Sequence, residues 1–149
     1  AAVGVDIETH RPVDLPALGR DALAPAEAAW LEGFTEPRER LLGFYRCWTR
    51  KEAVLKAVGV GLSVDLRRWD TVPAADRGTV RDTTSSPARL WAVENPPSLP
   101  DTTMAVGRPA ATAEDDLSIR ALSAAETGGA DFPVAGETTL KGFRALKEM

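Results

Sequence analysis

Two acidic residues near the start of the sequence, Asp6 and Glu8, lie in a stretch where Val and Ile alternate with small or acidic residues. This alternation predicts a β-strand, so both carboxylates are expected on the same face. Neighbouring carboxylates repel each other unless a positive charge lies between them. Oxygen ligands of this kind are what Mg²⁺ accepts in proteins. The pair therefore indicates a magnesium site, and the alternative interpretation is an ordinary solvated strand face.

A second candidate group lies on a helical stretch. Trp48, Glu52 and Lys56 are each four residues apart, which places them on one helix face. That face borders an apolar stripe formed by Leu41, Phe44, Trp48 and Leu55. Glu52 and Lys56 are therefore expected beside the core. The alternative is a plain Glu–Lys helix pair worth about 0.2–0.5 kcal/mol, with Trp48 as a core residue.

The same helical stretch is locally basic. Its basic residues are Arg38, Arg40, Arg46, Arg50, Lys51 and Lys56, and its acidic residues are Glu39 and Glu52. This surplus could steer an anionic ligand or an acidic partner, or it could be a solvated helix face. Lys51 is expected at the surface, either contacting a ligand or partner or simply solvated. His10 is expected to be a surface histidine, and Cys47 a small buried residue.

The elements that must hold these residues follow from periodicity. The alternation predicts a strand over residues 1–8. Pro25 favours the first turn of a short helix over residues 26–32. The apolar stripe predicts a long helix over residues 36–58, and Gly59 is a natural stop.

The rest of the chain is less strongly patterned. Strands are predicted over residues 89–94 and 103–107, and residues 66–72 are interpreted as a short strand or a turn. We divide the chain into a module over residues 1–108 and a C-terminal extension over residues 109–149. A further strand over residues 116–122 and a terminal helix over residues 140–146 are candidates within that extension.

Composition bounds the function. The 149 residues suit one domain, and a net charge of −4 argues against nucleic-acid binding. No apolar run approaches the roughly 20 residues that span a bilayer. One Cys and one His exclude a Cys–His zinc site within one chain and a disulfide framework, so a cytoplasmic location is the default. No secretory signal is visible, although the first residue is Ala.

Two motifs together resemble the 4′-phosphopantetheinyl transferase superfamily, which includes the holo-acyl-carrier-protein synthases. The block Gly4-Val5-Asp6-Ile7-Glu8, followed by Arg11, is similar to the family's Gly-x-Asp-x-Glu strand. Phe44 and the block from Trp48 to Leu62 are similar to its Trp-x-x-Lys-Glu-Ala-x-x-Lys-Ala-x-Gly-x-Gly-Leu helix and loop. The resemblance covers residues 3–66. It implies an α+β fold in which a small antiparallel sheet packs against a long helix.

The resemblance also implies a reaction and its residues. These enzymes move the phosphopantetheine arm of coenzyme A to a serine of an acyl or peptidyl carrier protein and release adenosine 3′,5′-bisphosphate. Asp6, Glu8 and Glu52 match the family's metal-binding acids, which implies Mg²⁺ as cofactor. Glu52 is also the candidate base, which would take the proton of the serine directly or through a water. Lys56 matches the motif lysine, which would bind coenzyme A and stabilise or protonate the leaving phosphate.

The length of the chain departs from the subtype that it resembles most. The Asp-x-Glu spacing, the Trp before Lys-Glu-Ala and the Pro25 helix start look like the second module of the larger, surfactin-synthetase-activating type. That type would place a whole module before residue 3. The chain is therefore expected to form a homo-oligomer or to be part of a larger two-module protein. The alternative function is a non-catalytic subunit that binds coenzyme A or a carrier protein.

Overall fold

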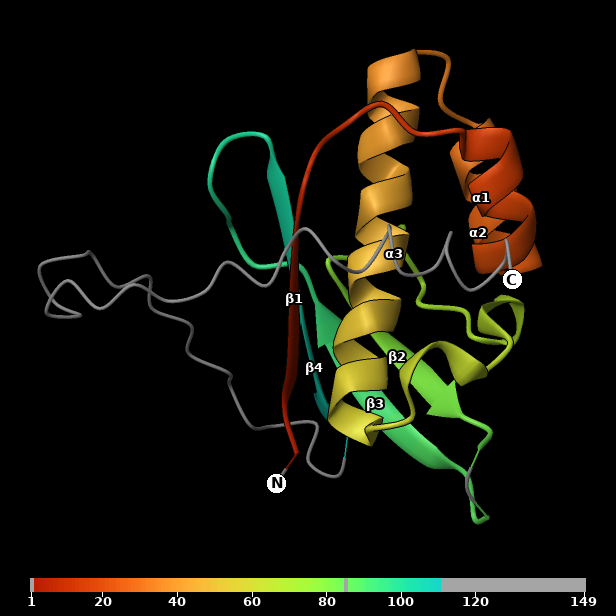
Figure 1. Ribbon diagram of the computed structural model, residues 1–149, viewed down its shortest axis with the longest axis vertical. Helices are drawn as coiled ribbons and strands as arrows, with labels where there is room; N and C mark the ends of the chain where they lie inside the picture. Colours follow the sequence, from red (N-terminus) through yellow and green to blue (C-terminus); the bar gives the residue numbers. More distant parts are fainter. Residues whose placement is uncertain (1, 85, 111–149) are drawn as a thin grey trace, which may run out of the picture. The chain divides into compact units, whose positions relative to one another are not determined.

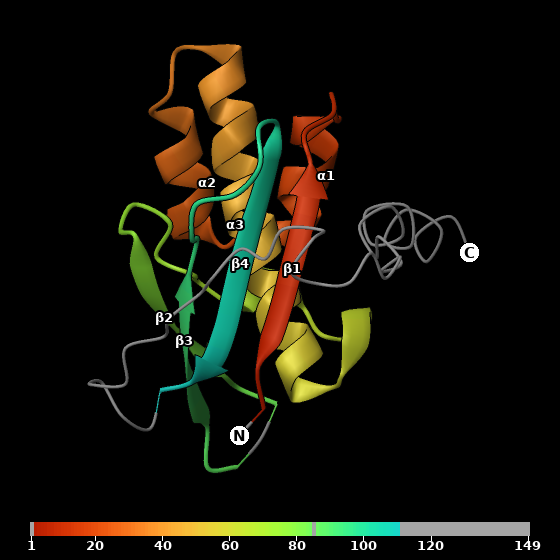
Figure 2. The same ribbon diagram turned by 90° about the vertical axis from the view of Figure 1, so that its left-hand side faces the viewer.

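A computed structural model of the chain describes residues 2–84 and 86–110, except for the Leu62 side chain. The strand predicted over residues 116–122 and the helix predicted over residues 140–146 lie outside the described residues. Four strands form one antiparallel sheet in the order β1-β4-β3-β2. Figures 1 and 2 show the long helix α3 lying across one face of this sheet, with α1 and α2 on the far side of α3. The expected α+β fold, a small antiparallel sheet against a long helix, is confirmed.

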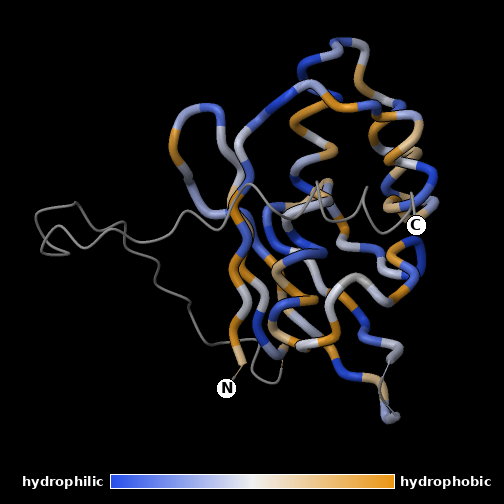
Figure 3. The backbone as a smooth tube through the Cα atoms, viewed as in Figure 1, coloured by the Kyte–Doolittle hydropathy of each residue, from blue (hydrophilic) through white to orange (hydrophobic). Residues whose placement is uncertain are grey.

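Strand β1 (Gly4–Thr9) forms one edge of the sheet and pairs with β4 (Thr102–Pro109). Figure 3 shows hydrophobic and hydrophilic residues alternating along β1. The alternation has an unusual sense, because Asp6 and Glu8 are buried whereas Val5 is 48% exposed. The acidic face of the strand therefore points towards α3.

Helix α3 (Pro37–Val58) approaches β1 and β4 closely because glycines face it. Gly4 and Gly107 are opposite each other in the strand register. A Cβ atom at Gly4 would overlap the carbonyl oxygen of Ala53. The close approach sets the separation between the acidic residues of β1 and the side chains of α3.

The core lies between α3 and the sheet. Phe44, Trp48 and Leu55 of the predicted stripe are buried, together with Trp69 and Trp91. Removing a buried aromatic side chain of this size typically costs about 3–5 kcal/mol. The helix ends where expected, because Gly59 has a φ of 81° and its N–H donates to the Leu55 carbonyl at 2.8 Å.

Helix α1 (Leu15–Ala22) was not predicted, whereas α2 (Pro25–Glu32) matches the expected short helix. Pro16 occupies the first turn of α1, where proline needs no N–H partner. Asp14 caps the helix by accepting from the Ala17 N–H at 3.0 Å.

The strand β3 (Arg89–Glu94) and β4 agree with the sequence expectations, whereas β2 (Arg77–Asp82) was missed. Strand β2 is the other edge of the sheet, and its polar residues leave only Val80 as a buried apolar side chain. The strand alternative for residues 66–72 is wrong, because Leu66–Arg68 forms a 3₁₀ helix. No helix in residues 2–84 and 86–110 has the length and apolar character needed to cross a membrane.

Candidate active site

The two acidic residues of β1 lie in the interface between the strand and α3. Asp6 is 2% exposed and Glu8 is 1% exposed. The alternative of a solvated strand face is therefore wrong. A buried carboxylate needs a partner or a proton, because removing its charge from water is costly. Each of the two side chains accepts a hydrogen bond from a residue of α3.

Helix α3 supplies these partners from the face that the four-residue spacing predicted. The Lys56 Nζ donates to Asp6 Oδ1 at 2.7 Å, and the Trp48 Nε1 donates to Glu8 Oε1 at 3.3 Å. Glu52 lies between these two residues on the same face and is itself buried. The structure thus brings together Asp6, Glu8, Glu52 and Lys56. The hydrogen bond from Trp48 is a contact that the sequence did not indicate.

Burial and mutual repulsion shift the proton affinity of the three acids. Burial, followed by the charge of Asp6, raises the pKa of Glu52 to about 8. Burial and then the charge of Asp6 raise the pKa of Glu8 to about 7. Burial also raises the pKa of Asp6, although the hydrogen bond and charge of Lys56 oppose this shift. Such shifts are common where acid–base chemistry or cation binding occurs.

The chemistry of these side chains fits a hard divalent cation. All three supply oxygen donors, which Mg²⁺ prefers. Asp6 Oδ2 and Glu52 Oε1 are buried without a hydrogen-bond partner among the described residues. Nevertheless, no group of three or more His, Cys, Asp or Glu in that part of the chain is arranged as a metal ligand set. The acids therefore have suitable donor atoms in one interface but do not form a complete ligand set as they stand, and Lys56 contacts Asp6.

A family comparison gives this constellation its context. The family model of the 4′-phosphopantetheinyl transferase superfamily matches residues 2–106, which include both motifs and all four residues. The chain belongs to the 4′-phosphopantetheinyl transferase superfamily.

Two curated relatives agree with this family. A Haemophilus influenzae protein named as a 4′-phosphopantetheinyl transferase is 40% identical over 62 residues, which cover 42% of this chain and 25% of the relative. The 4′-phosphopantetheinyl transferase HetI of Nostoc is 37% identical over 77 residues, which cover 48% of this chain and 32% of the relative. The chain thus matches about a quarter to a third of the length of these superfamily relatives.

A solved structure of the superfamily shares the fold. The holo-ACP synthase of Plasmodium yoelii superposes with a TM-score of 0.50 at 14% identity. The superposition covers 72% of this chain and 92% of the synthase. At this identity the likeness is one of fold.

The lysine of the superfamily motif next to Glu52 has a role that corrects the sequence interpretation. Lys51 was expected at the surface, but its side chain and that of Glu27 are completely buried and their charged atoms lie 2.6 Å apart. The Lys51 Nζ also donates to the carbonyls of Ala22 and Leu66 at 2.6 and 2.7 Å. Lys51 therefore ties α1, α2 and the segment after α3 together.

The basic surface expected on α3 is smaller than the charge count suggested. Arg50 is also fully buried, and burial lowers its pKa to about 10. Its guanidinium donates to the Asn95 side chain at 2.6 Å and to four backbone carbonyls at 2.7–3.0 Å, those of Thr71, Val72, Ala75 and Asp76. Two of the six cations thus stabilise the interior and are not available to a partner.

The sequence also predicted the positions of Cys47 and His10. Cys47 is buried as expected, and burial raises the pKa of its thiol. His10 is half-buried; its Nε2 lies 2.7 Å from Thr103 Oγ1 and its ring packs against Tyr45. Burial lowers the pKa of His10.

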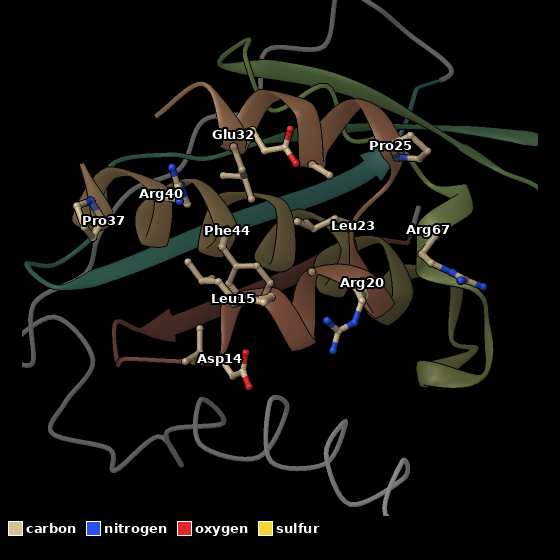
Figure 4. Close-up of a pocket in the computed structure, with 15 residues that line it drawn as sticks. Asp14, Leu15, Arg20, Leu23, Pro25, Glu32, Pro37, Arg40, Phe44 and Arg67 are labelled. Carbon is tan, nitrogen blue, oxygen red and sulfur yellow. The ribbon is translucent and has the colours of Figure 1, made fainter. Parts of the chain in front are cut away.

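A pocket of about 710 Å³ lies between α1, α2 and the N-terminal half of α3. Figure 4 shows Leu15, Leu23 and Phe44 around its centre, with Arg20 and Glu32 also among the lining residues. The pocket is not lined by any of the four candidate site residues, Asp6, Glu8, Glu52 and Lys56. One of its walls is α1, a helix that the sequence pattern did not predict.

Proposed function

We propose that this chain transfers the 4′-phosphopantetheine arm of coenzyme A to a serine of an acyl or peptidyl carrier protein. The observation that supports this proposal is the convergence of Asp6, Glu8, Glu52 and Lys56 between β1 and α3 in a chain of this superfamily. In the reaction, the serine oxygen forms a bond to the phosphorus of the phosphopantetheine. The pyrophosphate P–O bond of coenzyme A breaks, and adenosine 3′,5′-bisphosphate leaves with the bonding electrons.

Glu52 is proposed as the base that takes the serine proton, directly or through a water. Burial raises the pKa of Glu52 above that of an ordinary Glu, and a general base works best when its pKa lies near the working pH. Lys56 follows one helix turn later on the same face and carries the positive charge that a leaving phosphate needs. Catalysis by this site would rest on positioning and electrostatics.

We propose Mg²⁺ as the cofactor, held by Asp6, Glu8 and Glu52. When bound, the cation supplies neutralisation of the pyrophosphate charge and a template for its orientation. The buried oxygens of Asp6 and Glu52 that lack hydrogen-bond partners support this assignment. Loss of activity on chelation, with recovery on adding Mg²⁺ or Mn²⁺, would show which ion serves the site.

We infer that a second module or a second copy completes the coenzyme A site. The Haemophilus relative is about 250 residues long, because 62 residues are 25% of it. This supports the likeness to one module of the larger, two-module type. If a second copy completes the site, a two-fold dimer or a three-fold ring would be a closed assembly. We therefore expect the 149-residue chain to run above its monomer mass of 15.9 kDa in sizing experiments. A catalytically active monomer would refute this part of the proposal.

The function is tested by incubating the full chain with coenzyme A, Mg²⁺ and an apo carrier protein, and by measuring the intact mass of the carrier. We expect one phosphopantetheine group on the carrier serine with the wild type and none with Asp6→Asn. Glu39→Gln, an exposed change on the same helix, should retain activity. No adduct on any of several carriers, with coenzyme A binding intact, would favour a non-catalytic binding subunit instead.

A further inference from the structure

Lys56 lies where it conflicts with the role proposed for it. Its Nζ contacts Asp6 Oδ1 at 2.7 Å, on a carboxylate assigned to a divalent cation. The Asp6 side chain is 1% exposed, whereas the Lys56 side chain is 39% exposed. The ammonium therefore reaches from the solvent side onto a buried acid. While it holds that position, Lys56 occupies one of the oxygens that a cation would use.

Lys56 compensates part of the negative charge of the three acids around this contact. Asp6, Glu8 and Glu52 together carry −3 when all are ionised, and Lys56 supplies +1. The second oxygen of Asp6 and one oxygen of Glu52 are buried without a hydrogen-bond partner in the described part of the chain. When they are ionised, the carboxylates are thus incompletely neutralised, and the interaction of Asp6 with Lys56 substitutes for part of the charge of a divalent ion.

We propose that Lys56 is an exchangeable counter-ion, which neutralises Asp6 while the cation site is empty and leaves Asp6 when a divalent cation binds there. The inference rests on the proposed function, because it takes the metal assignment from it. The flexible, partly exposed stem of Lys56 lets the ammonium move without moving α3. A cation-binding event then has a second effect, since it frees the ammonium for a phosphate oxygen of the substrate.

The exchange predicts an order of binding. The ammonium that serves the phosphate becomes available after Asp6 has gained another cation, so metal binding favours phosphate binding and, by reciprocity, phosphate favours metal. Conversely, the contact between Lys56 and Asp6 must be broken before the metal can bind. The free energy needed to break a charge-assisted hydrogen bond of this type should weaken the apparent metal affinity about tenfold.

The test measures the reactivity of the Lys56 amine towards an acetylating reagent, by peptide mass spectrometry on the full chain. Free Nα-acetyl-lysine is the reference amine, and fully buried Lys51 is the internal control for opening of the fold. We expect Mg²⁺ to raise the Lys56 acetylation rate severalfold and to leave Lys51 unreactive. In Asp6→Asn, Lys56 should react rapidly without metal and show no response to Mg²⁺.

A binding measurement completes the test. Mn²⁺ affinity, measured by electron paramagnetic resonance of the free ion at pH 9, should be about tenfold tighter for Lys56→Met than for the wild type. Arg38→Met, which removes an exposed cation from the same helix, should leave it unchanged. If the cation binds but Lys56 reactivity does not rise, the exchange is wrong and the metal site stands. If neither Mg²⁺ nor Mn²⁺ binds, the metal assignment fails and the exchange fails with it.

Discussion

Replacing Glu52 with glutamine keeps the shape of a buried side chain and removes its charge. One carboxylate oxygen of Glu52 has no hydrogen-bond partner in the described part of the chain. Its pKa rises from an ordinary value of 4.5 to about 8 in the folded protein. Between these two values the folded state binds more protons than the unfolded state, so the free energy of unfolding falls as the pH rises. The destabilisation is complete only above about pH 8.

The size of the effect follows from the same two values. A tenfold change in proton affinity corresponds to about 1.4 kcal/mol, which sets a ceiling of about 5 kcal/mol for Glu52 alone. Because Asp6 and Glu8 repel Glu52 and share the cost, we expect Glu52→Gln to raise the free energy of unfolding at pH 9 by about 2–3 kcal/mol. At pH 5, where Glu52 is protonated in the folded protein, the substitution should have little effect.

The assay is urea unfolding of the full chain at pH 5 and pH 9, in a chelator, followed by tryptophan fluorescence. Glu39→Gln is the matched control, because Glu39 is an exposed acid on the same helix. It should change stability by less than about 0.5 kcal/mol at both pH values. The reasoning is refuted if Glu52→Gln gains no stability at pH 9 relative to pH 5, or if the gain is the same at both.

Three further predictions concern the same packing and charges. Lys51→Met leaves the buried Glu27 carboxylate without its cation and should cost about 3–5 kcal/mol in urea unfolding, and a loss below about 1 kcal/mol would mean that the ion pair is not holding the interior. Gly4→Ala pushes a methyl group against the backbone of Ala53 and should lower stability by about 2 kcal/mol or more in the same measurement, and a neutral result would show that β1 and α3 are further apart than described. Mg²⁺ should raise the melting temperature more at pH 9 than at pH 6, because the carboxylates must lose protons to bind it, and an equal shift at both would contradict the raised pKa values of Glu8 and Glu52.

The strongest local patterns predicted the elements that carry the candidate site. Alternation over β1 and the stripe on α3 gave both elements, and the spacing of Glu52 and Lys56 placed them on one face. These features depend on neighbours along the chain. The missed elements are those where local rules conflict with context: Pro16 is tolerated in the first turn of α1, and β2 is an edge strand with few apolar residues.

The misplaced residues share a different cause. Lys51 lies about 100° around the helix from Glu52, a position that looked solvated when α3 was considered alone. Its partner, Glu27, comes from α2, which packs against that side of α3. Arg50 is likewise buried by carbonyls of a segment that begins more than twenty residues later. Contacts between distant segments of this kind cannot be derived from periodicity in one sequence.

We propose that the residues between β1 and α3 carry out phosphopantetheinyl transfer. The most direct measurement quantifies modified carrier protein and adenosine 3′,5′-bisphosphate together, in one time course with coenzyme A and Mg²⁺. We expect equal molar amounts of the two products with the wild type and the loss of both with Glu52→Gln. Bisphosphate released without modification of the carrier, or transfer that persists at the wild-type rate in Glu52→Gln, would contradict it.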